Sequence, residues 1–256
     1  ECFLLPILEY CRQSSGKGIK AILLYPMNAL AFDQAGRLVR AITHSFGLRG
    51  QVTAGLFVGQ SQADPQYRMS EHSIITDKDI LRQSPPDILL TNYKMLDYLL
   101  LRGRDKPLWA QNDPETLRFL VVDEMHTFDG AQGADLALLL RRLKYRLKTP
   151  NEHLVCVGSS ATLGSGEEAK TELRRYAETI FGETFDEEAV VTETRKTPNE
   201  VFGDPEFLDR PDPAEIHVAL REAEELDQVG AALRLAKCLF PDRTDPDLAF
   251  LEEGDP

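Results

Sequence analysis

Five short apolar runs, separated by segments with helical periodicity, constrain the fold of this chain more than any other feature. Each run is bounded by turn-forming or polar residues, and the five lie at positions 21–25, 52–58, 88–90, 119–122 and 154–157. Runs of this length and character are typical of strands that are buried on both faces. Helical patterns lie between them, at 29–43, 93–101 and 133–147. This alternation predicts an α/β fold, with a parallel sheet flanked by crossover helices.

The acidic charge of the chain is concentrated near its C-terminus. The formal net charge is −13, but residues 199–256 hold 16 acidic and 5 basic side chains, against 26 and 24 in residues 1–198. We therefore expect an α/β domain over 1–198 and an acidic, mainly helical linker or insertion over 199–256, with one helix at 213–240. The near-neutral first part leaves nucleic-acid binding open. Its basic run at 141–148 suits either a solvated helix face or a nucleic-acid contact.

Composition argues against several classes of protein. Hydrophobic residues make up 42% of the chain and charged residues 28%, a balance typical of a globular domain and not of a disordered or collagen-like chain. The apolar runs are far shorter than the roughly 20 residues of a membrane-spanning helix, so no membrane partner is expected. The four cysteines are scattered without a CxxC pair. This favours reduced thiols in a cytoplasmic protein over a zinc site or a disulfide framework.

Polar residues directly follow four of the predicted strands. The clusters are Pro26-Met27-Asn28, Thr91-Asn92-Tyr93, Asp123-Glu124-Met125-His126 and Gly158-Ser159-Ser160-Ala161-Thr162. Ligands of open parallel sheets bind at the carboxyl ends of the strands, so we expect the four clusters to share one edge of the sheet.

The adjacent carboxylates of Asp123 and Glu124 are the most informative of these residues. In a metal–nucleotide site the first acid holds Mg²⁺ and the second orients and deprotonates the attacking water. The pair equally suits the cap and first turn of the next helix. No second His or Cys lies at metal-ligand spacing from His126, so a zinc site is poorly supported. His126 is instead placed to hydrogen-bond across to Ser160 or Thr162. Those two residues suit helix capping equally well.

Taken in this order and at these intervals, the four clusters resemble motifs Ia, Ib, II and III of the superfamily 2 DExH-box helicases. The segments 130–143 and 163–182 also resemble the Lhr-like and MrfA-like DNA helicases, and the resemblance covers roughly residues 1–195. It implies a RecA-like motor domain, the first of two, that binds nucleic acid and hydrolyses ATP with Mg²⁺ in the cleft between the domains. The implied partners are single-stranded or duplex DNA, favoured over RNA, and the second RecA-like domain of the same protein.

The resemblance also implies a role for each cluster. Asp123 would hold Mg²⁺ through water, and Glu124 would activate the attacking water. His126 would couple hydrolysis to strand movement together with Ser160, Ala161 and Thr162. The remaining residues would lie along one nucleic-acid strand, with Tyr93 either stacking on a base or packing: Pro26, Asn28, Thr91, Asn92 and Tyr93. DNA repair and defence against foreign DNA both fit such a motor.

The chain departs from the family pattern at its start. It contains no GxxxxGK(S/T) phosphate-binding loop, and its first helical segment, from Glu1, resembles the one that follows this loop in the family. We expect the chain to begin just after a Walker A motif and to hydrolyse ATP poorly by itself. Two other interpretations stay open: a degenerate motor that serves as a binding scaffold, and a metal-dependent nuclease, which normally needs more acidic residues around two metals.

Overall fold

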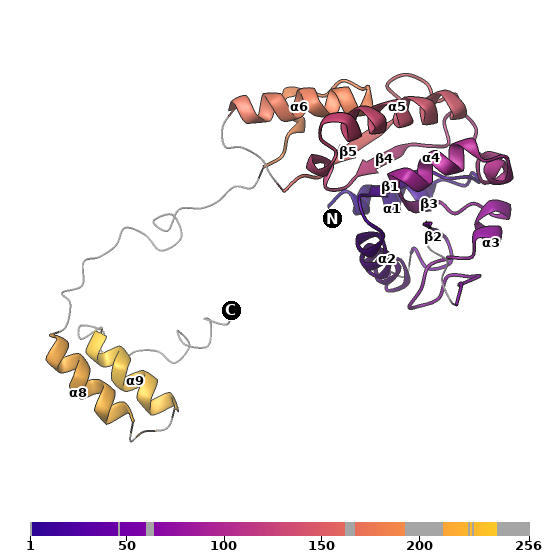
Figure 1. Cartoon of the computed structure of the whole chain (residues 1–256). Helices are drawn as coiled ribbons and strands as arrows, with labels where there is room; N and C mark the ends of the chain where they lie inside the picture. The colour runs from indigo at the N-terminus through magenta and orange to yellow at the C-terminus, as the bar shows by residue number, and fades with distance from the viewer. Residues whose placement is uncertain are drawn as a thin grey trace. The chain divides into compact units, whose positions relative to one another are not determined.

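A five-stranded parallel sheet lies at the centre of the N-terminal unit (Figure 1). Its strands are β1 (Ala21–Tyr25), β2 (Ala54–Phe57), β3 (Ile88–Asn92), β4 (Phe119–Val122) and β5 (Val155–Gly158), in the order β2-β3-β1-β4-β5. Every neighbouring pair is parallel. The predicted α/β fold is confirmed, and each of the five apolar runs contains or overlaps one strand. The predicted burial is wrong for β5, an edge strand whose Val155 is 37% exposed.

The computed structural model describes residues 2–45, 47–59, 64–161, 167–192, 212–224, 226 and 228–239. In the N-terminal unit the helices are α1 (Leu4–Gln13), α2 (Asn28–Thr43), α3 (Lys78–Gln83), α4 (Tyr93–Leu101), α5 (Gly130–Leu147) and α6 (Glu167–Phe181). Three 3-10 turns accompany them, η1 (Gly103–Trp109), η2 (Met125–Thr127) and η3 (Glu187–Ala189). The predicted helices at 29–43, 93–101 and 133–147 are confirmed, although α2 and α5 begin slightly earlier.

Each face of the sheet buries its own hydrophobic core. Leu24 of β1 and Val122 of β4 pack with α4, α5 and α6, whereas Leu23 and Val121 pack with α1 and α2 on the opposite face (Figure 1). Because helices cover both faces, the central strands need apolar side chains at every position. This is why they appear in the sequence as continuous apolar runs.

A buried ion pair joins the amino ends of three strands. Lys20, which precedes β1, is only 3% exposed, and its Nζ lies 2.5 Å from Oδ1 of Asp87, which precedes β3. Oδ2 of Asp87 accepts hydrogen bonds of 2.7 Å from both the backbone N–H and the hydroxyl of Thr53, which precedes β2. One carboxylate therefore fixes where three neighbouring strands begin.

The unit Thr192–Pro256 contains a pair of described helices, α8 (Pro213–Ala223) and α9 (Gln228–Leu239). The prediction of one helix over 213–240 is wrong. Glu222 of α8 and Arg234 of α9 form an ion pair of 2.6 Å, so the two helices pack against each other. Folding back in this way buries Ala219 and Ala223 of α8, an apolar stripe that a single straight helix would leave exposed. None of the helices in the described segments is long and apolar enough to cross a lipid bilayer.

Candidate functional site

The carboxyl edge of the sheet brings together the polar clusters that follow its strands. In the parallel register Tyr25 lies opposite Asn92, and Val122 lies opposite Gly158. The residues that continue these strands therefore emerge at one edge. The described part of the edge divides into two groups, one at the ends of β1 and β3 and the other at the ends of β4 and β5.

Asn28 and Asn92 connect the ends of β1 and β3. Nδ2 of Asn92 donates to Oδ1 of Asn28 at 2.6 Å, while Oδ1 of Asn92 caps α4 by accepting from the N–H of Met95 at 2.7 Å. No described residue bonds to the amide nitrogen of Asn28, so this group remains a donor at the edge of the sheet. Pro26 lies beside it, partly buried between β1 and α2.

The other two residues predicted to bind nucleic acid contribute mainly to packing in this structure. The side chain of Thr91 is fully buried, and its hydroxyl donates to the carbonyl of Phe57 at 2.6 Å, within the sheet. The ring of Tyr93 packs edge-to-face on Phe128 at a centroid distance of 5.3 Å. Of the two interpretations of Tyr93, the geometry favours packing.

Ser159 organises the acidic pair at the end of β4. Its hydroxyl donates to Oδ1 of Asp123 and accepts from the backbone N–H of Glu124 at 3.0 Å. Its carbonyl accepts from the N–H of Met125 at 2.7 Å. These bonds hold Glu124 in the left-handed conformation, with φ 51° and ψ 46°, which is uncommon for a residue other than glycine.

Ser159 was not among the predicted site residues. Its role follows from the pairing of β4 with β5, because Val122 lies opposite Gly158 and the next residues, Asp123 and Ser159, then face each other. The signal available in the sequence was its position directly after the fifth apolar run. Strand neighbours are not evident from that position alone.

His126 lies between the two loops of this group. Its Nδ1 is 3.4 Å from the hydroxyl of Ser160, the backbone nitrogen of Ala161 and Oε2 of Glu124. His126 therefore lies within contact distance of both the loop after β4 and the loop after β5. Thr162, the remaining predicted coupling residue, lies outside the described residues.

Two helices support the turn that carries the acidic pair. The hydroxyl of Tyr176 on α6 donates to the carbonyls of Phe128 and, at 3.2 Å, of Met125. Burial, followed by the charge of Asp129, raises the pKa of Tyr176 above its ordinary value. A Cβ at Gly133 of α5 would lie 2.6 Å from the Phe128 carbonyl, so this close approach requires glycine.

The acidic pair fits a bound magnesium ion and an activated water. Ser159 occupies one oxygen of Asp123, and no described residue donates to the other oxygen, which leaves a hard ligand of the kind that Mg²⁺ prefers. The Glu124 side chain is 38% exposed, so water has access to its carboxylate. The chain contains no GxxxxGK(S/T) sequence to hold the phosphates.

Sequence comparisons connect this chain with helicases. The family model described as DEAD/DEAH box helicase matches residues 1–170. Over 139 residues the chain is 33% identical to the Druantia protein DruE of Escherichia coli, and this match covers 52% of this chain and 7% of DruE. Over 178 residues it is 26% identical to the uncharacterized ATP-dependent helicase YprA of Bacillus subtilis, covering 67% of this chain and 20% of YprA. The chain thus spans a minor part of each of these relatives.

Solved structures share the fold. A crystal structure of the DUF1998 helicase MrfA has a TM-score of 0.52 and 20% identity, covering 100% of this chain and 35% of MrfA. MrfA bound to DNA and AMPPNP has a TM-score of 0.51 and 22% identity, covering 72% of this chain and 22% of MrfA. The sheet and its flanking helices therefore match a RecA-like helicase domain.

Proposed function

Because the chain belongs to the DEAD/DEAH box helicase family, we propose that it forms the first RecA-like domain of an ATP-dependent helicase or translocase that acts on DNA. Residues 1–198 make up this domain, and residues 199–256 form an acidic linker or insertion toward a second RecA-like domain. The observation that carries the proposal is the acidic pair Asp123 and Glu124, held at the end of β4 by Ser159. The choice of DNA is supported by the DNA-bound structures of MrfA, which shares the fold.

The acidic pair has two separate tasks in this proposal. Asp123 would hold Mg²⁺ through water, and the ion, when bound, would supply charge neutralisation at the phosphates of ATP. Glu124 orients the attacking water and accepts its proton. Because the 256 residues contain no GxxxxGK(S/T) loop, this chain by itself hydrolyses ATP poorly, and the complete gene product is the material for every test.

The His126 region couples hydrolysis to movement along the strand. His126 contacts Glu124 on one side and Ser160 and Ala161 on the other, so a change at the acidic pair reaches the end of β5. Pro26, Asn28 and Asn92 contact the strand at the neighbouring edge, together with the backbone of Thr91 and Tyr93. Such contacts position a strand without reading its sequence.

The cellular setting follows from the same properties. The four cysteines are free thiols, the state that a reducing compartment maintains, and we place the protein in the cytoplasm. A DNA-dependent motor of this kind serves DNA repair or defence against foreign DNA.

The substitution Glu124→Gln tests the proposed chemistry. The amide keeps the shape of the side chain but no longer accepts a proton, so ATP binding should persist while turnover falls by about 10² to 10⁴. The matched control is Glu115→Gln, an exposed glutamate outside the site, which should leave turnover unchanged. Equal turnover in the wild type and Glu124→Gln would contradict the role of Glu124. A complete gene product without any ATPase activity would favour a scaffold instead.

The double substitution Ser160→Ala with Thr162→Ala tests the coupling. ATP hydrolysis should be largely retained while DNA unwinding is lost, because these residues are proposed to transmit the reaction and not to perform it. Equal loss of hydrolysis and unwinding would place this loop in the ATP site.

A further inference from the structure

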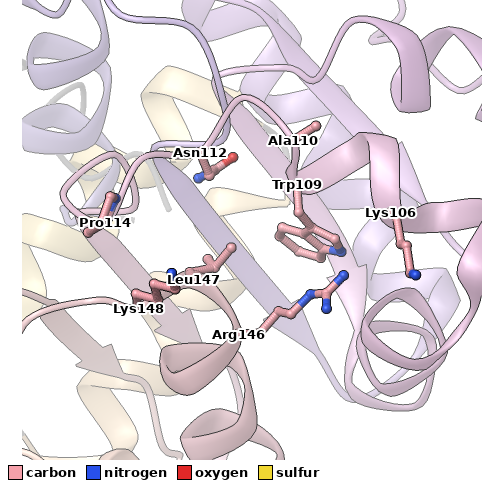
Figure 2. A pocket seen from close by; sticks show the side chains of 8 residues that line it. All are labelled: Lys106, Trp109, Ala110, Asn112, Pro114, Arg146, Leu147 and Lys148. Carbon is pink, nitrogen blue, oxygen red and sulfur yellow. The ribbon is translucent and has the colours of Figure 1, made fainter.

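A basic cavity lies between η1 and the C-terminal end of α5 (Figure 2). Its volume is about 370 Å³, and its lining includes Lys106 and Trp109 of η1 together with Arg146 and Lys148. Figure 2 shows Arg146 reaching from α5 toward Trp109, with Lys106 on the η1 side. Three cations from two separate elements therefore surround one hollow, and they include part of the basic run whose role the sequence left open.

The three cations of this cavity are not neutralised within the described segments. Lys106, Arg146 and Lys148 have no side-chain hydrogen bond or ion pair there, although their α5 neighbours Arg142 and Lys144 are paired with Asp97 and Glu183. Asp105, which precedes Lys106, pairs instead with Arg82, and Asp113 and Glu115 in the loop after η1 form no ion pair with the three cations. Cations near the end of a helix offset its dipole, but this does not account for Lys106, which comes from a different element.

A second cavity extends this surface along α5. It measures about 790 Å³ and shares the lining residues Arg146 and Lys148 with the first, so the two cavities are adjacent; together they are called the basic groove. Its lining includes Tyr145, which is 88% exposed. It also includes Thr149, whose buried hydroxyl has no hydrogen-bond partner among the described residues.

The groove lies at the amino ends of the strands, opposite the carboxyl ends where the acidic pair lies. Asn112, which lines the first cavity, bonds to both the N–H and the carbonyl of Ile19, two residues before β1 begins. A five-residue strand spans about 17 Å at 3.3 Å per residue. The groove is therefore separate from the carboxyl-edge site.

We propose that the basic groove binds the phosphodiester backbone of a nucleic-acid strand, as a contact additional to the carboxyl edge. The choice of nucleic acid as occupant rests on the proposed function. Unpaired Lys and Arg side chains neutralise phosphates, and the exposed Tyr145 in the lining of the second cavity offers a stacking surface for a base. Such a groove tracks a strand without reading its sequence, as a motor that moves along DNA requires.

Substitution of the three unpaired cations tests the groove. The variant Lys106→Gln/Arg146→Gln/Lys148→Gln is compared with Arg68→Gln/Arg175→Gln/Arg221→Gln, which removes three exposed cations elsewhere. Binding of single-stranded DNA to the complete gene product is measured against salt concentration. Each phosphate contact with single-stranded DNA contributes about 0.7 to the magnitude of the slope of log affinity against log salt concentration. The slope should therefore become shallower by about 2 in the groove variant, whereas the control variant should keep the wild-type slope.

The length of the DNA separates this groove from the carboxyl edge. An oligonucleotide of about six nucleotides occupies one binding site at a time, so the groove variant should bind it at most about twofold more weakly than the wild type. It should lose much more affinity for an oligonucleotide of about 30 nucleotides, which contacts both sites. Tyr145→Ala should weaken binding of the longer DNA by roughly tenfold without changing the salt slope, because stacking releases no counterions.

Several outcomes would overturn the proposal. Equal salt slopes for the groove and control variants would show that the groove does not meet phosphates. Preferential binding of poly-glutamate over DNA by the wild type but not by the groove variant would assign it to an acidic protein segment. The proposed function fails separately: it is wrong if the complete gene product has no ATPase activity that DNA stimulates, whereas the salt slopes of the groove and control variants still decide the groove.

Discussion

Replacing Ser159 by alanine tests the account of the acidic pair most directly. The hydroxyl of Ser159 donates to Asp123 and accepts from the N–H of Glu124, so the substitution removes two hydrogen bonds at once. The substitution also removes a bond that holds Glu124 in the left-handed conformation. That conformation costs roughly 1–2 kcal/mol for a residue other than glycine, so it needs such support.

The expected loss of stability follows from these contacts. A hydrogen bond to a charged group contributes about 1.5–3 kcal/mol, and an unsatisfied buried donor costs about 1–3 kcal/mol. Because Ser159 is only partly buried, water replaces some of the lost bonding, and we expect a decrease of about 2 kcal/mol in the free energy of unfolding. For a domain of about 150–250 residues this corresponds to a decrease of roughly 4–8 °C in Tm.

The neighbouring serine provides the control. Among the described residues the hydroxyl of Ser160 has one hydrogen-bond partner, His126 at 3.4 Å, so Ser160→Ala should change the free energy of unfolding by less than about 0.5 kcal/mol. Urea and thermal unfolding of both variants measure the difference, and ATPase turnover should fall in Ser159→Ala because Asp123 loses its fixed orientation. Equal stability of the two variants would refute the role given to Ser159.

Two further predictions concern the body of the domain. Asp87→Ala should lower the free energy of unfolding by about 3–5 kcal/mol, because it leaves the buried charge of Lys20 without its partner. The control Asp33→Ala removes an exposed ion pair and should cost at most about 1 kcal/mol. Similar losses for the two variants in urea unfolding would contradict this prediction. Burial raises the pKa of the Cys11 and Cys156 thiols to about 12, from an ordinary value of 9.0. These thiols ionise first in the unfolded chain, so the free energy of unfolding should be unaffected below pH 9.0 and fall as the pH rises toward 12. Cys11→Ala/Cys156→Ala should weaken this dependence in urea unfolding, and an unchanged dependence would count against it.

The sequence by itself determined the strands, their alternation with helices, and the residues that emerge at the carboxyl edge. It did so because a strand covered on both faces needs apolar side chains throughout, so its position appears as a continuous run such as 119–122. The placement of Asp123 and Glu124 after β4 follows from that run. The order of the four clusters was likewise sufficient to indicate the helicase family.

Only the tertiary structure decided which residues face one another. Ser159 meets Asp123 because β5 pairs with β4 in one register, and the Thr91 hydroxyl turns inward because the carbonyl of Phe57 lies beside it. The break between α8 and α9 reflects the burial of an apolar stripe against a second helix, which local periodicity does not reveal. Lys106 and Arg146 line one cavity although they lie far apart in the chain. Strand order and helix packing bring such residues together, and neither is encoded in the spacing of residues along a single segment.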